Sequence, residues 1–282
     1  MAYAFATLGT LTAIIAFFLI AAQAGRSIAR PAELFDAQGM GGTIISIVCT
    51  NVTLGTGLVY FISLFDQAAL GALGAVTGTL LGYFYLDRLL TRVNFDPATD
   101  GNLVSHLMQT KSPSFVFYTY SAMLVLVYIF ILAVEIVIST PFIASTLGFS
   151  EPLTFSFYTA IIILIIPAII AFMGGLRGVI NTEFLQFILI LGLLISLIWL
   201  AMMPSVVSGH HPRDPLSFAF TPQGLLVGIS AFATAFATQL YNIVNIGLLS
   251  KHQSSDFKPI IRISGLIVVG VIVVLATVGA FL

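Results

Sequence analysis

Long apolar stretches alternate with short polar ones along the whole chain. Eight stretches have the roughly 20 mostly apolar residues that a helix needs to cross a hydrocarbon core of about 30 Å. They cover residues 5–24, 42–64, 67–90, 116–147, 153–173, 182–203, 222–248 and 260–282. The stretches 116–147 and 222–248 are longer than a crossing requires, so we expect a tilt or a break in each. The pattern predicts an all-α protein with about eight transmembrane helices in one domain, residues 1–282.

The composition agrees with an integral membrane protein. Hydrophobic residues make up 59% of the 282 residues and charged residues 7%, and the mean hydropathy is +1.10. Such a chain has too little polar surface to stay soluble as a globular protein. We therefore expect a multi-pass protein of the cell membrane, in bacteria the inner membrane, with the lipid bilayer as its surroundings.

The basic residues predict how the helices are oriented. If the N-terminus lies outside, nine of the ten Lys and Arg residues fall in inner loops and only Arg213 falls outside. The nine are Arg26, Arg30, Arg88, Arg92, Lys111, Arg177, Lys251, Lys258 and Arg262. Because Lys and Arg near helix ends resist translocation, this bias favours an outside N-terminus and, with eight spans, an outside C-terminus.

A polar segment interrupts the second apolar stretch near its middle. Residues 50–57 include Asn51, Thr53, Gly55 and Thr56, a composition that is poor for a helix. A broken helix at membrane depth is tolerated where its free backbone groups line a protein cavity, and many secondary transporters bind solute and ions at such breaks. The alternative is a face of Thr and Gly that packs against another helix.

The seventh stretch has a second polar cluster. Thr234, Thr238, Gln239, Tyr241, Asn242 and Asn245 follow a run of small residues. Side chains three or four residues apart share a helix face, so several amides are expected to point towards one cavity. A hydrogen-bond network between helices, without any ligand, would explain the same pattern.

Two carboxylates within apolar sequence also attract attention. Glu135 follows about 15 residues of apolar helix, and a charge at that depth normally faces the inside of a helix bundle. We expect it to be a proton or cation site, although a simple hydrogen bond to Ser139 remains an alternative. Glu183 and Gln186 lie at the beginning of the sixth stretch, where a carboxylate is favourable at a helix N-terminus without any function.

Glycines predict two structural features. Gly74, Gly78 and Gly82 recur every four residues in the third stretch, which is typical of a helix that packs closely against another. Residues 174–178 contain three glycines between two apolar stretches, so they indicate a tight cytoplasmic turn rather than a phosphate-binding loop.

Several classes of function have no support in the sequence. His210 and His211 are adjacent in an outer loop, and no nucleophile or metal-ligand spacing occurs, so we expect no enzyme and no cofactor. A net charge of −1 without any basic run argues against nucleic acid as a partner. The single Cys49 cannot form an intrachain disulfide.

Residues 174–186 resemble the signature of the sodium:solute symporter family. In that family a Gly-Gly-Leu-basic turn leads to Thr-Asp and then to Gln, and here the turn is followed by Thr182, Glu183 in place of Asp, and Gln186. Residues 25–42 and 100–111 are similar to the family's segments before the second and fourth helices. Residues 50–51 and 239–251 are similar to its first and second broken helices, with Asn245-Ile246 in place of its Gln-Arg pair.

The resemblance implies an architecture of inverted repeats. One extra N-terminal helix, residues 5–24, would precede a five-helix repeat at 42–203, and residues 222–282 would begin a second, inverted repeat. The family's sodium site combines carbonyl groups of the first broken helix with Ser or Thr hydroxyls from helices beyond residue 282. We expect a fragment of a longer protein, a shortened homologue, or a chain that assembles with helices from the same gene or from a partner.

The sequence thus predicts a cation-coupled secondary transporter of a small polar solute, or its N-terminal portion, working by alternating access. Sodium is the favoured cation. Solute contacts are expected from Thr53, Thr56, Gln239, Tyr241 and Asn242, and ion coupling or gating from Asn51, Gly55, Glu135, Glu183 and Gln186. The alternative is a membrane sensor or scaffold that has the transporter fold without transport.

Overall fold

The computed structural model describes residues 2–26, 39–52, 69–93, 96, 103, 106, 114–147, 152–203, 221–250 and 252–281. Within these residues every regular element is a helix, and no strand occurs. The helices are α1 Ala2–Arg26, α2 Met40–Asn51, α4 Ala69–Leu90, α7 Ser114–Leu147, α8 Pro152–Ala201, α11 Pro222–Tyr241, α12 Ile243–Leu249 and α13 Ser254–Phe281. The prediction of an all-helical chain is confirmed for this part of the molecule.

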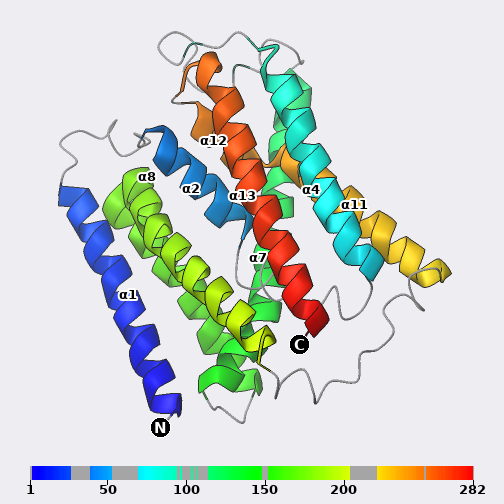
Figure 1. Cartoon of the computed structure of the whole chain (residues 1–282). Helices are drawn as coiled ribbons and strands as arrows, with labels where there is room; N and C mark the ends of the chain where they lie inside the picture. Colours follow the sequence, from blue (N-terminus) through cyan, green and yellow to red (C-terminus); the bar gives the residue numbers. More distant parts are fainter. Residues whose placement is uncertain are drawn as a thin grey trace.

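Helices lie at all eight predicted positions, although α2 covers only the first part of the predicted second stretch, whose residues 53–64 lie outside the described part of the chain, and two further boundaries differ. The predicted fifth and sixth stretches belong to α8, which is interrupted where Gly175 has non-helical dihedral angles, φ 56° and ψ −157°. Only glycine adopts a positive φ readily, so this residue allows the chain to reverse there, as Figure 1 shows. The predicted seventh stretch is divided into α11 and α12 at Asn242, where φ is −69° and ψ is 85°.

Three helical segments in the described residues are long and apolar enough to cross a membrane. They are Ala69–Leu90 in α4, Gly178–Ala201 in the second half of α8, and Ser254–Gly279 in α13. Half of the most apolar part of α4 and of α13 is buried within the molecule, but only 11% of that part of α8. Helices α4 and α13 therefore have one face in the bundle and one face outside it, whereas the second half of α8 faces mostly outwards.

Five of the six described basic residues, all except Arg177 of α8, lie near the ends of α1, α4 and α13. Arg26 ends α1, Arg88 and Arg92 lie at the end of α4 and just beyond it, and Lys258 and Arg262 lie near the start of α13. The end of α4 and the start of α13 lie at the top of Figure 1, the end of α1 lies at the left and below them, and both chain ends lie lower in the view. We call the side of the molecule formed by the end of α1, the end of α4 and the start of α13 the basic end. The arrangement agrees with the predicted grouping of these five residues on one side.

The predicted row of glycines on α4 packs against α11. A Cβ atom added at Gly74 would collide with the backbone carbonyl of Gly228, and one at Gly78 with the carbonyl of Phe232. A Cβ atom at Gly82 would come within 2.8 Å of the Cβ of Gln239. Close helix packing, the structural explanation of this motif, is therefore confirmed, and α11 is the partner.

A second set of contacts joins α2, α4, α8 and α13 into one apolar core. Its fully buried members include Ile47 and Val48 of α2, Leu90 of α4 and Phe257 of α13. Because lipid tails are as apolar as these side chains, close van der Waals packing rather than removal from water holds such a core together within a membrane. The core holds the end of α2 beside the α4–α11 pair, and that placement determines the geometry of the site described next.

Candidate functional site

The helix α2 ends inside the segment for which the sequence predicted a break. Its last residue is Asn51, and Val52 has φ −121° and ψ 69°, outside the helical region. The amide of Val52 still donates to the carbonyl oxygen of Val48, at 3.0 Å, so the helix closes with an ordinary final turn. Up to residue 52, the last described residue of this segment, the polar segment is therefore the end of a helix and not a continuous packing face.

The helix α11 ends in the same way at the other polar cluster. Tyr241 is its last residue, Asn242 is non-helical, and the carbonyl oxygen of Asn242 accepts the amide of Ile246 at 3.1 Å, in the first turn of α12. Asn242 is buried. The chain therefore makes a break of a single residue, and its polar side chain stays inside the molecule.

The ends of α2 and α11 meet through two amide side chains. The Nε2 atom of Gln239 donates a hydrogen bond of 3.1 Å to the Oδ1 atom of Asn51. The Nδ2 atom of Asn51 donates to the carbonyl oxygen of Ile47 at 2.7 Å, and this bond directs Oδ1 towards Gln239. Two predicted site residues that are 188 positions apart in the sequence are thus in direct contact.

Gln239 has one hydrogen-bonding atom to spare. Its side chain is 4% exposed and lies against Gly82, where a larger residue would displace it. The Oε1 atom is buried and has no hydrogen-bond partner among the described residues. A buried carbonyl oxygen of this kind can accept a hydrogen bond from an ammonium, amide or hydroxyl group, or coordinate a hard cation.

Glu183 lies on the other side of α2, at the start of the second half of α8. The hydroxyl group of Ser46 hydrogen-bonds its carboxylate, and the thiol of Cys49 donates to its backbone carbonyl oxygen at 3.2 Å. Its Oε2 atom is buried without a partner among the described residues. The structure therefore places this carboxylate at the contact of α2 with α8, within the two turns that precede Asn51.

Glu135 accepts a hydrogen bond from within its own helix. The hydroxyl group of Ser139 donates to its Oε1 atom at 3.3 Å, which is the hydrogen bond that the sequence offered as the simple explanation. The carboxylate is half-buried, and α7 packs mainly against α8 and α1. A role in cation or proton binding remains a prediction.

The other predicted site residues differ in what the structure describes. Thr53, Gly55 and Thr56 lie outside the described residues. The backbone of Tyr241 ends α11, but its side chain is not among those described. Gln186 is half-buried, three residues after Glu183 on α8.

Two polar contacts at the basic end were not predicted. The Nε atom of Arg262 on α13 donates to Oδ2 of Asp87 on α4 at 2.8 Å, and its Nη2 atom lies at the same distance from that oxygen. Asp87 was not among the residues that the sequence singled out, and it stands next to Arg88 near the end of α4. In the second contact, Oγ1 of Thr43 on α2 lies 2.8 Å from Nε2 of His252, which follows α12.

The described residues contain no set of ligands for a transition metal. In the described ranges, no three His, Cys, Asp or Glu side chains come close enough together to hold a metal ion. The oxygen atoms of Gln239 and Glu183 are ligands that a hard monovalent cation prefers, and helix ends add backbone carbonyl groups.

Comparison of this chain with known protein families, with curated proteins and with solved structures finds no match.

Proposed function

We propose that the chain forms the solute- and cation-binding part of a cation-coupled secondary transporter that works by alternating access. The observation that supports this most is the contact between Asn51 and Gln239, which joins two interrupted helices at their ends. Interrupted helices that meet at membrane depth offer unpaired backbone groups to a solute and its coupling ion. The resemblance of residues 174–186 to the sodium:solute symporters supports the same proposal.

In this proposal the solute lies at the ends of α2 and α11. Gln239 and Asn242 contribute amide groups, and Thr53, Thr56 and Tyr241 complete the contacts. The free Oε1 atom of Gln239 suits a solute that carries a hydrogen-bond donor, such as an amino acid, a sugar or an osmolyte.

The cation roles fall on the groups around the end of α2. Asn51 and Gly55 contribute to the cation site, which sodium is proposed to occupy. Glu183 and Gln186 on α8 are proposed to gate the site on the side of the basic end. The hydrogen bond between Ser46 and Glu183 links the position of this carboxylate to that of α2, the first broken helix. Glu135 is assigned a supporting role as a proton or cation site.

The topology belongs to the same proposal. Eight crossings, with both chain ends outside and the basic end in the cytoplasm, follow from the charge bias. The apolar lengths of α4, the second half of α8 and α13 support three of these crossings. One extra helix, a first repeat of five helices and the beginning of an inverted repeat would account for the order of the elements, and the bacterial inner membrane is the proposed location.

Uptake by proteoliposomes tests this proposal. Radiolabelled amino acids, sugars and osmolytes are offered under an inward sodium gradient, with potassium in place of sodium as the reference. We expect sodium-dependent uptake of at least one class, and loss of that uptake when Gln239→Leu removes the amide. Thr234→Ala, an exposed change one turn earlier on α11, should leave it unchanged.

Two results would count against the proposal in different ways. Uptake that responds to neither a sodium nor a proton gradient would contradict the coupling. No uptake of any solute class by a protein that still unfolds cooperatively would favour the sensor or scaffold that uses the fold without transport.

A further inference from the structure

The outer surface between α4 and α13 has a distinctive order of side chains. On α4, Leu80, Phe84 and Arg88 follow one another every four residues, and on α13 Lys258, Arg262 and Leu266 do the same. All six are exposed, from 46% for Leu80 to 67% for Leu266 among the apolar residues. We call these six residues the α4/α13 surface.

The two halves of this surface lie side by side. Asp87 is the direct link, because its carboxylate binds Arg262, and the ring of Tyr83 lies against Gly265 one turn further from the basic end. Residues four apart occupy nearly the same side of a helix. Arg88 and Phe84 therefore flank the contact on α4, as Arg262 and Leu266 flank it on α13.

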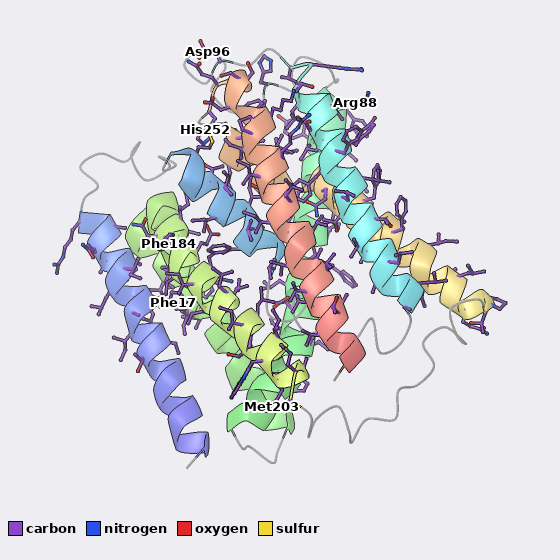
Figure 2. All side chains as sticks on the ribbon, in the orientation of Figure 1. Phe17, Arg88, Asp96, Phe184, Met203 and His252 are labelled. Carbon is purple, nitrogen blue, oxygen red and sulfur yellow. The ribbon has the colours of Figure 1, made fainter. Side chains whose placement is uncertain are left out.

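Charge and apolar area are separated along this surface. The three cations gather at the basic end, and the three apolar side chains extend from them towards the opposite end. Figure 2 shows Arg88 at the basic end of α4. Both helices are long and apolar enough to cross a membrane and are only half buried in the bundle, so the other half of each is available to lipid.

The charge balance favours an anionic ligand. Asp87 is 5% exposed and neutralises one of the three cations, while the guanidinium group of Arg262 remains 55% exposed. Arg88 lies over the ring of Phe84, 5.4 Å from its centroid, and keeps its positive charge at the surface. Asp256, the other acidic residue of α13, precedes Lys258 by two positions and lies on a different side of the helix.

We propose that the α4/α13 surface binds an anionic phospholipid. Arg88, Lys258 and Arg262 hold the phosphate group, and the acyl chains lie along Leu80, Phe84 and Leu266. Arginine suits this role because its planar fork matches the oxygens of a phosphate. The inference is independent of solute transport, since it rests on the surface of the bundle and not on the broken helices.

Native mass spectrometry of the full chain measures this preference. Phosphatidylglycerol and phosphatidylcholine are offered at equal concentration, and the bound fractions give the ratio of the two dissociation constants. Arg88→Gln with Lys258→Gln should lower the preference for phosphatidylglycerol by about thirtyfold, because each basic side chain near an anionic headgroup strengthens binding about fivefold. Arg26→Gln with Arg92→Gln removes the same charge at the same end and should leave the preference unchanged.

Three results would overturn the proposal. The first is equal binding of both lipids by the unaltered chain. The second is an equal loss of the preference in the two double variants, which would indicate attraction to the whole basic end. Displacement of phosphatidylglycerol by millimolar inorganic phosphate would indicate a site for free anions instead of lipid.

Fluorescence quenching tests where the acyl chains lie. The chain has a single tryptophan, Trp199, which is 67% exposed on α8, a helix that contributes no residue to the α4/α13 surface. Phe84→Trp in a Trp199→Phe background should be quenched about twofold more by brominated phosphatidylglycerol than by brominated phosphatidylcholine, as expected of a headgroup held by adjacent cations. Trp199 in the unaltered chain should be quenched equally by both lipids. Equal quenching of the tryptophan at position 84 would contradict the proposed position of the acyl chains.

Discussion

Gln239 on α11 donates a hydrogen bond of 3.1 Å to Asn51 at the last position of α2. The acceptor is oriented by its own helix, through the bond from Asn51 Nδ2 to the carbonyl oxygen of Ile47. The donor is held from behind by Gly82 of α4. Three helices thus fix one amide pair, and the ends of the two interrupted helices cannot separate without breaking it.

Removal of either amide should destabilise the protein through the group that it leaves unpaired. Asn51→Leu and Gln239→Leu are each expected to cost about 1 kcal/mol of unfolding free energy, because the amide that remains is buried in the case of Gln239 and half-buried in the case of Asn51. The double variant should cost less than the sum by about 0.6 kcal/mol, a common value for hydrogen bonds between membrane helices. Unfolding in mixed micelles measures the cycle, and strictly additive losses would contradict the contact.

The α4–α11 contact should not tolerate a methyl group. Gly78→Ala places a Cβ against the carbonyl oxygen of Phe232, so the helices must move apart, at a cost of about 2 kcal/mol. Gly270→Ala on α13 is the matched control, since no atom lies within 4 Å of its Cβ position. That change should be neutral or slightly stabilising, as Ala is about 1 kcal/mol better than Gly in a helix. Equal effects of the two changes on thermal unfolding would refute the proposed contact.

The two partners of the ion pair at the basic end should respond unequally. Arg262→Met leaves the buried carboxylate of Asp87 without its counter-ion, at a cost of about 3 kcal/mol. Asp87→Asn leaves Arg262, which is half exposed, in contact with water, and should cost about 1 kcal/mol. Denaturant unfolding of the two variants measures the difference. The reverse order would mean that Asp87 is not buried in the membrane-embedded protein.

His252 should make stability depend on pH near neutrality. Burial lowers the pKa of its imidazole, and the nearby Asp256 opposes this only in part. The unfolded chain therefore binds a proton more readily than the folded chain below a pH of about 6.5, so stability falls as the pH decreases through that value. We expect the melting temperature of the unaltered chain to fall more between pH 8 and pH 5.5 than that of His252→Gln. Parallel pH profiles would show that the imidazole is freely solvated.

The positions of the helices were predictable because they follow from local sequence. Apolar length predicted a helix at each of the eight places and a tilt or break in the seventh stretch, and the Thr, Asn and Gly residues at 50–57 predicted the break at which α2 ends. The glycines at positions 74, 78 and 82 predicted close packing, since their spacing alone places them on one face.

Partners across helices were not predictable from the same patterns. Nothing near Asp87 indicates that Arg262, 175 positions away, would bind it, and the sequence singled out Glu183 without Ser46 or Cys49. The partner of a side chain depends on which helices are neighbours and on their relative rotation, and the local pattern of a single sequence encodes neither. For the same reason the spacing in α11 predicted that amides share a face but not that Gln239 reaches Asn51.

Alkylation of Cys49 tests alternating access most directly, without knowledge of the solute. This residue is the only cysteine, it is buried on α2, and it stands two positions before Asn51. If sodium shifts the balance between two arrangements of the broken helices, the rate of reaction with a small thiol reagent in proteoliposomes should change severalfold when sodium replaces potassium. Ser255→Cys in a Cys49→Ser background, exposed at the basic end, should react at the same rate in both salts. Identical rates for Cys49 in sodium and potassium would contradict the account.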